Sequence, residues 1–247
     1  MQRLSLLTLA LTLGPGLAAA QGPDAGVTLT YGGGIAATSG LYVGQEDERL
    51  PFPILTASYG NWTADLTRGL RYAALSTESS RVEVGLAYRL GPDLPDIALF
   101  DGLDRGGHPE LVAAVEHQFE GLDIAAEFGA DLWSPHGGLR ADLSVGQSVA
   151  VGLFEVKGRL GAEYLDADAA AHLYGVRPDE ATSLRAAYQP GALWTPRIEL
   201  SASLPVGSGA ELVGFLEYRA LPDAVADSPL VADRTETTFG LSLTRSF

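Results

Sequence analysis

The stretch Gly152-Leu-Phe-Glu-Val-Lys-Gly-Arg-Leu-Gly-Ala-Glu-Tyr164 separates into two rows when it is read in steps of two residues. One row contains glycine, alanine and large apolar residues, and the other carries Glu155, Lys157, Arg159 and Glu163. Alternation with a period of two predicts a β-strand that has one apolar and one ionic face. Strands of soluble sheets usually have about five or six residues, so this strand is long.

The same alternation recurs along the rest of the chain. The segments that show it predict about twelve strands, over residues 27–37, 51–59, 62–74, 81–90, 109–119, 121–131, 138–147, 150–164, 184–192, 195–205, 210–220 and 234–247. Charges of both signs gather on one row of the clearest segments, whereas the opposite row is apolar. These charged rows supply the residues that we expect to face an enclosed lumen: Arg81, Glu83, Arg89, Glu127, Arg140, Asp142, Glu155, Lys157, Arg159, Glu163, Glu217 and Arg219.

Strand length and charge placement favour a membrane-spanning barrel. Ten residues at about 3.3 Å each, tilted by about 40°, project roughly 25 Å along the membrane normal, which matches the apolar band of outer-membrane barrels. A soluble sandwich or a lipocalin-like barrel would also alternate, with its apolar row inward. Aromatic residues near segment ends fit interfacial girdles. They are Tyr59, Trp62, Tyr88, Phe119, Tyr164 and Tyr218. We therefore expect an all-β fold, a closed antiparallel transmembrane β-barrel.

Short connections alternate with longer polar ones, as in barrels that have a turn side and a loop side. Short connections are expected at Gly60-Asn61, Glu120-Gly121 and 206–209. The longer ones lie near 39–49, 91–108, 165–183 and 221–233. Three predicted crossings separate Gly60-Asn61 from Glu120-Gly121, so the two turns cannot face the same side. Either one tight turn faces outward, or the segment 91–108 contains a crossing or folds back.

The first twenty residues are typical of a cleaved signal peptide. Arg3 precedes an apolar run over 4–13, and Ala18-Ala19-Ala20 supplies the small residues that cleavage requires. The apolar run is too short to span a bilayer as a permanent helix. We expect residues 1–20 to be removed on export to the bacterial outer membrane, and residues 21–247 to form the barrel domain.

The chain ends with Phe239-Gly-Leu-Ser-Leu-Thr-Arg-Ser-Phe247, an alternating strand with a terminal aromatic residue. A terminal Phe resembles the signal that outer-membrane assembly machinery reads, although Arg245 stands where an apolar or aromatic residue is usual. Phe247 is therefore the expected assembly signal. The barrel-assembly machinery and outer-membrane lipid, including lipopolysaccharide, are expected partners.

Composition narrows the possible functions. The sequence has 16 Lys+Arg against 31 Asp+Glu, a formal net charge of −15 that argues against a nucleic-acid partner. It contains no Cys, which excludes disulfides, thiolate metal sites and cysteine nucleophiles. The histidines form neither HExxH nor an HxH pair, so we expect no metal site and no cofactor. They are His108, His117, His136 and His172.

Seven short motifs, in order, make the chain resemble the MipA/OmpV family of outer-membrane proteins over almost the whole length after the signal peptide. The motifs are Tyr31-Gly-Gly-Gly34, Leu50-Pro-Phe-Pro53 leading to Tyr59-Gly60, Arg68-Gly-Leu-Arg-Tyr72, Ala87-Tyr-Arg-Leu-Gly91, His136-Gly-Gly-Leu-Arg-Ala-Asp142, Leu173-Tyr-Gly-Val-Arg-Pro178 and Asp227-Ser-Pro-Leu-Val-Ala-Asp-Arg234. The resemblance implies an outer-membrane barrel. It also implies a non-enzymatic scaffold that joins a murein-degrading lytic transglycosylase to a murein synthase, and no family-wide catalytic residue.

Two other functions remain open from the residues themselves. Mixed charges in a lumen could pass small solutes through a narrow channel, or could pair across strands and plug a small barrel. Ser134-Pro-His136 could belong to a barrel lipid hydrolase, because nucleophilic catalysis needs a serine close to a base. The same residues are also typical of a turn between strands.

Overall fold

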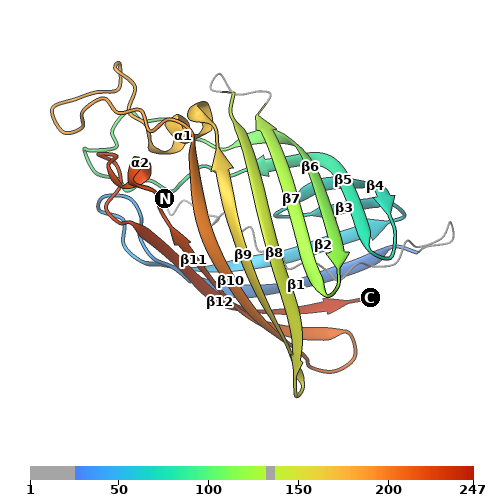
Figure 1. Cartoon of the computed structure of the whole chain (residues 1–247). Helices are drawn as coiled ribbons and strands as arrows, with labels where there is room; N and C mark the ends of the chain where they lie inside the picture. Colours follow the sequence, from blue (N-terminus) through green and yellow to red (C-terminus); the bar gives the residue numbers. More distant parts are fainter. Residues whose placement is uncertain (1–25, 132–136) are drawn as a thin grey trace.

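A computed structural model describes residues 26–131 and 137–247 of the chain. In this part the β-strands pair antiparallel in chain order, and the last pairs with the first, so the sheet closes into a twelve-stranded barrel (Figure 1). The predicted fold class is therefore confirmed. The strands are β1 (Thr28–Thr38), β2 (Glu48–Tyr59), β3 (Trp62–Asp65), β4 (Gly69–Ser76), β5 (Ser80–Arg89), β6 (His108–Phe119), β7 (Leu122–Asp131), β8 (Leu139–Val151), β9 (Phe154–Leu165), β10 (Leu193–Pro205), β11 (Ala210–Ala220) and β12 (Thr235–Ser246).

The connections differ in length at the two ends of the barrel. One end, which we call the turn end, has the short connections 60–61, 77–79, 120–121, 152–153 and 206–209. The other, the loop end, has the connections 39–47, 90–107, 166–192 and 221–234. The helices α1 (Ala167–Tyr174) and α2 (Asp223–Ala226) lie at the loop end (Figure 1). Neither described helix has the length and apolarity that a membrane crossing requires.

The alternation seen in the sequence becomes the two faces of the wall. In β9, Arg159 is 8% exposed, whereas its neighbour Leu160 is 59% exposed. The outward rows of the other long strands likewise carry exposed Leu, Val, Ile and aromatic side chains. On this outer surface, the rings of Tyr164 and Trp194 lie with centroids 5.0 Å apart. An apolar outer wall around an ionic interior is the arrangement that an outer-membrane barrel needs.

Two predicted strands were wrong. The predicted strand 62–74 is two strands, β3 and β4, because the Asp65 carboxylate accepts hydrogen bonds from the N–H groups of Thr67 (2.8 Å) and Arg68 (2.9 Å) and reverses the chain. The predicted strand 184–192 belongs to a loop-end connection, in which Tyr188 packs against a buried apolar cluster instead of a strand.

The extra β3–β4 hairpin also settles the direction of the turns. It adds one crossing between 60–61 and 120–121, so both turns lie at the turn end. The expected outward tight turn and the expected crossing within 91–108 were therefore wrong, and the third alternative, that 91–108 folds back, is not needed to place the two turns on one side. The count remained at twelve because one strand was gained and another was lost.

A buried apolar cluster joins the long connections at the loop end, and we call this assembly the cap. Its buried members come from several connections and from the ends of β9 and β10, and they are Leu41, Tyr42, Phe100, Leu165, Ala170, Tyr174, Val176, Leu193, Leu221, Val225, Leu230 and Val231. Two of the sequence motifs meet here, because Ser228 Oγ donates a hydrogen bond to the Tyr174 carbonyl oxygen at 2.7 Å. The loops are therefore packed together instead of extending separately.

Candidate functional site

The inward rows bring charged side chains from opposite walls into contact. Arg89 of β5 and Glu163 of β9 form an ion pair, with Nη2 and Oε1 3.0 Å apart. The other carboxylate oxygen of Glu163 lies 2.5 Å from Arg219 of β11, and Arg219 also pairs with Glu236 of β12 at 3.1 Å. β5 and β11 lie six places apart in the ring of twelve strands, so they face each other. We call these four residues the transverse bridge, because they span the interior.

A second group of ion pairs joins strands beside the transverse bridge. Nε of Arg140 lies 2.8 Å from Glu110, and its Nη2 lies 2.7 Å from Glu127. Glu127 also pairs with Arg71 at 3.1 Å. The Arg71 and Glu110 side chains are no more than 5% exposed. Charges removed from water are tolerated when they are paired, so these contacts compensate one another.

Further ion pairs continue around the interior. Glu83 pairs with Arg81 at 2.6 Å. On the other side of the barrel, Arg197 of β10 contacts Asp142 of β8 and lies 2.6 Å from Glu199. The interior is therefore crossed and lined by paired charges over much of its height.

The structure brings ten of the twelve predicted lumen residues into ion pairs. These ten are Arg81, Glu83, Arg89, Glu127, Arg140, Asp142, Lys157, Arg159, Glu163 and Arg219. Glu155 is instead exposed beside the turn 152–153. Glu217 is half-buried on the inward row of β11, between Phe215 and Arg219.

Several ion-pair partners were missed by the sequence-based selection. They are Arg68, Arg71, Glu110, Asp123, Arg197, Glu199 and Glu236. Period-two alternation could have selected Glu110 and Arg197, because each lies in step with the charged row of its own strand. Arg68 could not be found in this way, because it lies in the turn 66–68, outside any strand.

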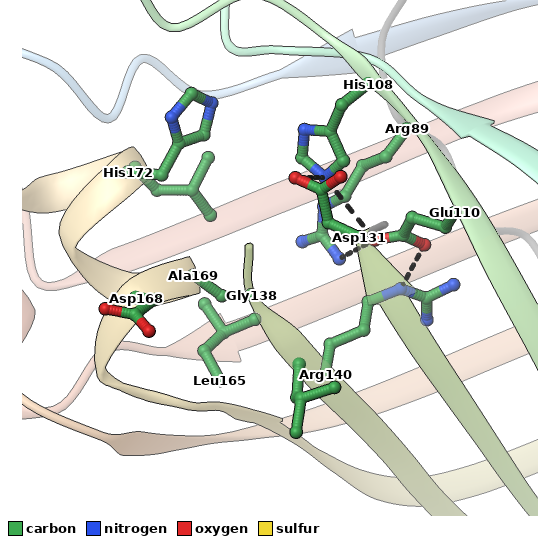
Figure 2. A pocket seen from close by; sticks show the side chains of 12 residues that line it. Arg89, His108, Glu110, Asp131, Gly138, Arg140, Leu165, Asp168, Ala169 and His172 are labelled. Carbon is green, nitrogen blue, oxygen red and sulfur yellow. Dashed lines mark hydrogen bonds and ion pairs between the residues drawn. The ribbon is translucent and has the colours of Figure 1, made fainter. Parts of the chain in front are cut away.

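A small pocket lies beside the transverse bridge, beneath α1 at the loop end (Figure 2). Its lining residues are Arg89, His108, Glu110, Asp131, Gly138, Leu139, Arg140, Leu165, Asp168, Ala169, His172 and Leu173. Nε2 of His108 lies 3.6 Å from Glu110 and 3.9 Å from Asp131. The His172 ring meets the His108 ring edge-on, with centroids 5.7 Å apart. The pocket therefore carries charges of both signs next to apolar side chains such as Leu139 and Leu165.

The residues considered for metal binding or hydrolysis lie partly outside the described ranges. Among the described residues, no group of three or more His, Asp or Glu side chains is arranged to hold a metal ion. Ser134 and His136, the candidate hydrolase pair, lie outside the described residues. Ser80 Oγ lies 2.8 Å from His117 Nδ1 on the outward face. Within the described ranges, no carboxylate forms an ion pair with His117, and a triad uses such a group to orient the imidazole.

A buried ion pair fixes the cap over the loop end. Arg105 donates two hydrogen bonds of 2.9 Å to the two oxygens of Glu180 and another of 2.9 Å to the Gly175 carbonyl oxygen. Burial opposes ionisation of the Glu180 carboxyl, but the hydrogen bonds from Arg105 and from the Arg177 N–H lower its pKa to about 2. Arg185 donates to the Glu180 carbonyl oxygen at 2.8 Å. These contacts connect the loops 90–107 and 166–192.

The chain terminus completes the seam of the barrel. The N–H of Phe247 donates to the Leu29 carbonyl oxygen at 3.0 Å, and the Leu29 N–H donates back at 3.3 Å. The Phe247 ring stacks on Tyr31 with centroids 5.5 Å apart, and the Arg245 guanidinium lies 4.8 Å from its centroid. The residue expected to signal assembly therefore lies where β12 closes onto β1.

Comparison with known proteins identifies relatives over most of the chain. The family model described as MltA-interacting protein MipA matches residues 31–247. A relative from Escherichia coli (strain K12), "Putative outer membrane protein YiaT", is 27% identical over 218 residues, which are 85% of this chain and 86% of the relative. The protein of the same name from Escherichia coli O157:H7 is 25% identical over the same shares.

Solved outer-membrane channels match the chain at low sequence identity. The COG4313 outer membrane channel from Pseudomonas putida F1 is 12% identical, with a TM-score of 0.43, and the match covers 90% of this chain and 94% of the channel. The outer membrane channel DcaP of Acinetobacter baumannii is 10% identical, with a TM-score of 0.41, and the match covers 93% of this chain and all of that channel.

Proposed function

The chain belongs to the MltA-interacting protein MipA family, and from this membership we propose that it is a non-enzymatic scaffold for murein-remodelling enzymes in the cell envelope. The protein is an outer-membrane β-barrel. The family description names an interaction with MltA, and the proposed scaffold role extends this interaction to the present chain. Its partners would be a murein hydrolase and a murein synthase.

The transverse bridge is the observation that best supports a scaffold over a channel. Arg89, Glu163 and Arg219 cross the interior from β5 to β11. The cap covers the loop end, where Arg105 and Glu180 are buried together. A barrel that is filled and capped in this way offers its outer surfaces and its ends for interaction.

The turn end is the proposed side for contact with murein enzymes. Short turns of outer-membrane barrels face the periplasm, which is the compartment that contains murein. Leu153, in the turn between β8 and β9, is 80% exposed.

The proposal also assigns residues 1–20 to an export signal and Phe247 to recognition by the assembly machinery.

The scaffold proposal is tested by cross-linking in intact envelopes, followed by detergent solubilisation and capture of the tagged barrel. We expect murein hydrolases and synthases to be captured with the wild-type protein. Leu153→Asp at the turn end should reduce this capture several-fold. Leu184→Asp is the matched control, because Leu184 is 60% exposed at the loop end. The proposal would be contradicted if no murein enzyme were captured with the tagged wild-type barrel. It would also be contradicted if both variants reduced the capture of these enzymes equally.

Planar-bilayer conductance separates the scaffold from a solute channel. The refolded wild-type barrel should show no stable single-channel steps, because the transverse bridge and the cap obstruct the interior. Arg89→Ala combined with Glu163→Ala removes the bridge without leaving a single unpaired charge from this pair. Stable steps in the wild type would favour the channel and would argue against a filled interior.

A further inference from the structure

The barrel wall is low at one place, between β2 and β5. β3 has only four residues, and its pairing with β2 begins at Thr56↔Asp65. Residues 48–54 of β2 therefore have β1 on one side but no strand on the other within the described residues. On the far side, the pairing of β5 with β4 begins at Leu86, which leaves 87–89 without β4. We call the interval bounded by 48–54, the turn 66–68 and 87–89 the wall notch.

The edge of β2 is adapted to this missing neighbour. Residues two apart on a strand direct their backbone groups to the same side. The Leu55 carbonyl oxygen accepts a hydrogen bond from the Leu66 N–H on the β3 side at 3.2 Å, so Pro51 and Pro53 are directed to that side too. Proline has no N–H, and hydrocarbon cannot satisfy an unpaired N–H group. The two prolines thus remove two of the donors that the wall notch would expose to lipid.

The turn at the bottom of the wall notch satisfies two of its backbone N–H groups internally. The Asp65 carboxylate accepts from the N–H groups of Thr67 and Arg68, and the Thr56 hydroxyl donates to it at 2.5 Å. The Arg68 side chain is directed inward and pairs with Glu83 at 3.0 Å. The exposed side chains of the turn are Leu66, which is 58% exposed, and Thr67, whose hydroxyl donates to Asp65 at 2.8 Å. This turn is therefore suited to an apolar environment.

The inward row of β2 beside the wall notch is apolar beyond Glu48, whereas Arg68 and Arg89 on its other sides belong to the ionic rows. Leu50, Phe52 and Ile54 form the inward row of β2 and alternate with exposed residues. The Phe52 ring meets the Phe215 ring of β11 inside the barrel, with centroids 6.3 Å apart. A Cβ atom at Gly34 would lie 2.8 Å from Cε1 of Phe52, so glycine at this position leaves room for the ring.

The loop after β5 limits the wall notch at the loop end. Gln45 Nε2, just before β2, donates a hydrogen bond to the Asp93 carbonyl oxygen at 3.5 Å. The Tyr88 hydroxyl donates to the Gly107 carbonyl oxygen at 3.0 Å. These contacts hold both ends of the loop 90–107 close to the strands that flank the wall notch.

We propose that the wall notch binds one acyl chain of an outer-membrane lipid, which enters from the side and contacts Phe52. The lipid-facing outer wall is continuous with the rim of the wall notch, where Leu86 and Tyr88 are exposed. An acyl chain needs no hydrogen bonds, and the Leu50–Phe52–Ile54 row provides only apolar side chains. This lipid site is independent of the scaffold role, since it requires no protein partner.

Quenching of single tryptophans by lipids brominated on the acyl chain tests this site. Trp62, Trp133 and Trp194 are first replaced by Phe, and one residue is then replaced by Trp in the barrel refolded into brominated vesicles. Phe52→Trp probes the wall notch. Phe128→Trp is the lipid-exposed reference, since Phe128 is 53% exposed on the outer wall, and Phe100→Trp is the shielded reference in the cap. Ala125→Trp, on the inward row of β7, reports quenching through a complete wall, because β7 is paired along its length on both sides.

The expected result is that Phe52→Trp loses nearly as much fluorescence as Phe128→Trp, and clearly more than Ala125→Trp. Quenching of Phe52→Trp no greater than that of Ala125→Trp would overturn the proposal. Ile54→Trp provides a second probe on the same row if Phe52→Trp does not refold. Because purified barrel and lipid are the only components, the result does not depend on capture of murein enzymes.

Discussion

Arg89 and Glu163 are 74 residues apart in sequence and lie on strands separated by β6, β7 and β8, yet their side chains meet at 3.0 Å. Such a contact is made across the interior and not along the sheet. Glu163 holds Arg219 with its other oxygen, so one carboxylate connects two arginines from facing walls. These contacts connect facing walls of the barrel through its interior.

Glu163→Gln should destabilise the barrel strongly. The substitution keeps the side-chain shape but leaves Arg89 and Arg219 without the carboxylate that compensates their charges. Removing one partner of a buried ion pair typically costs about 3–5 kcal/mol. Urea unfolding of the barrel in lipid vesicles, followed by tryptophan fluorescence, measures the change. Glu155→Gln is the control, because Glu155 is exposed; equal effects of the two substitutions would show that the bridge does not stabilise the fold.

Asp65→Ala should loosen the β3–β4 hairpin. It removes the acceptor for the N–H groups of Thr67 and Arg68, and each buried group left without a partner costs about 1–3 kcal/mol. Asp65→Asn retains one side-chain oxygen and should recover much of the loss. Hydrogen exchange of these two amides should accelerate in the alanine variant. Unchanged exchange would mean that the carboxylate does not form the turn.

Gly34→Ala should be destabilising because the space is already occupied. The added Cβ would lie 2.5 Å from the Leu241 carbonyl oxygen, in addition to its contact with Phe52. Overpacking of this kind costs about 1–3 kcal/mol. Gly158→Ala is the matched control, because its Cβ would meet only Leu200 at 3.6 Å. The unfolding midpoint should fall for the first variant and change little for the second.

The cap should lose stability in acid through Glu180. The pKa of this carboxyl is about 2 in the folded protein, below its ordinary value of 4.5. The charged form is therefore favoured by folding. The stabilisation of the folded protein by ionised Glu180 is fully present above about pH 4.5 and is lost as the pH falls towards 2. The lowered pKa corresponds to a contribution on the order of 3 kcal/mol.

Comparison with Glu180→Gln isolates this contribution. The difference in unfolding midpoint between wild type and variant should be largest at neutral pH and should shrink as the pH falls below 4.5. Glu46→Gln, at an exposed carboxylate in the loop 39–47, should follow the wild-type curve. A difference that stays constant from pH 7 to pH 2.5 would show that ionisation of Glu180 does not stabilise the cap.

Much of the fold could be predicted because alternation is a local property. Leu160 and Arg159 are adjacent in sequence and must point to opposite faces of a strand, so the two rows were visible without any tertiary information. The hairpin at Asp65 was harder to see. The alternation of Trp62–Tyr72 continues on both sides of the turn, and only the hydrogen bonds to Asp65 interrupt it.

The sequence by itself therefore determined a closed barrel with an apolar outer wall and charges inside, because a period of two assigns every side chain to one of two faces. Tertiary structure alone decided which charges meet. The pairing of Arg89 with Glu163, the low wall beside Pro51 and the cap around Glu180 depend on how the strands are staggered when the sheet closes. That stagger is set by contacts among residues far apart in the chain, and no local pattern records it.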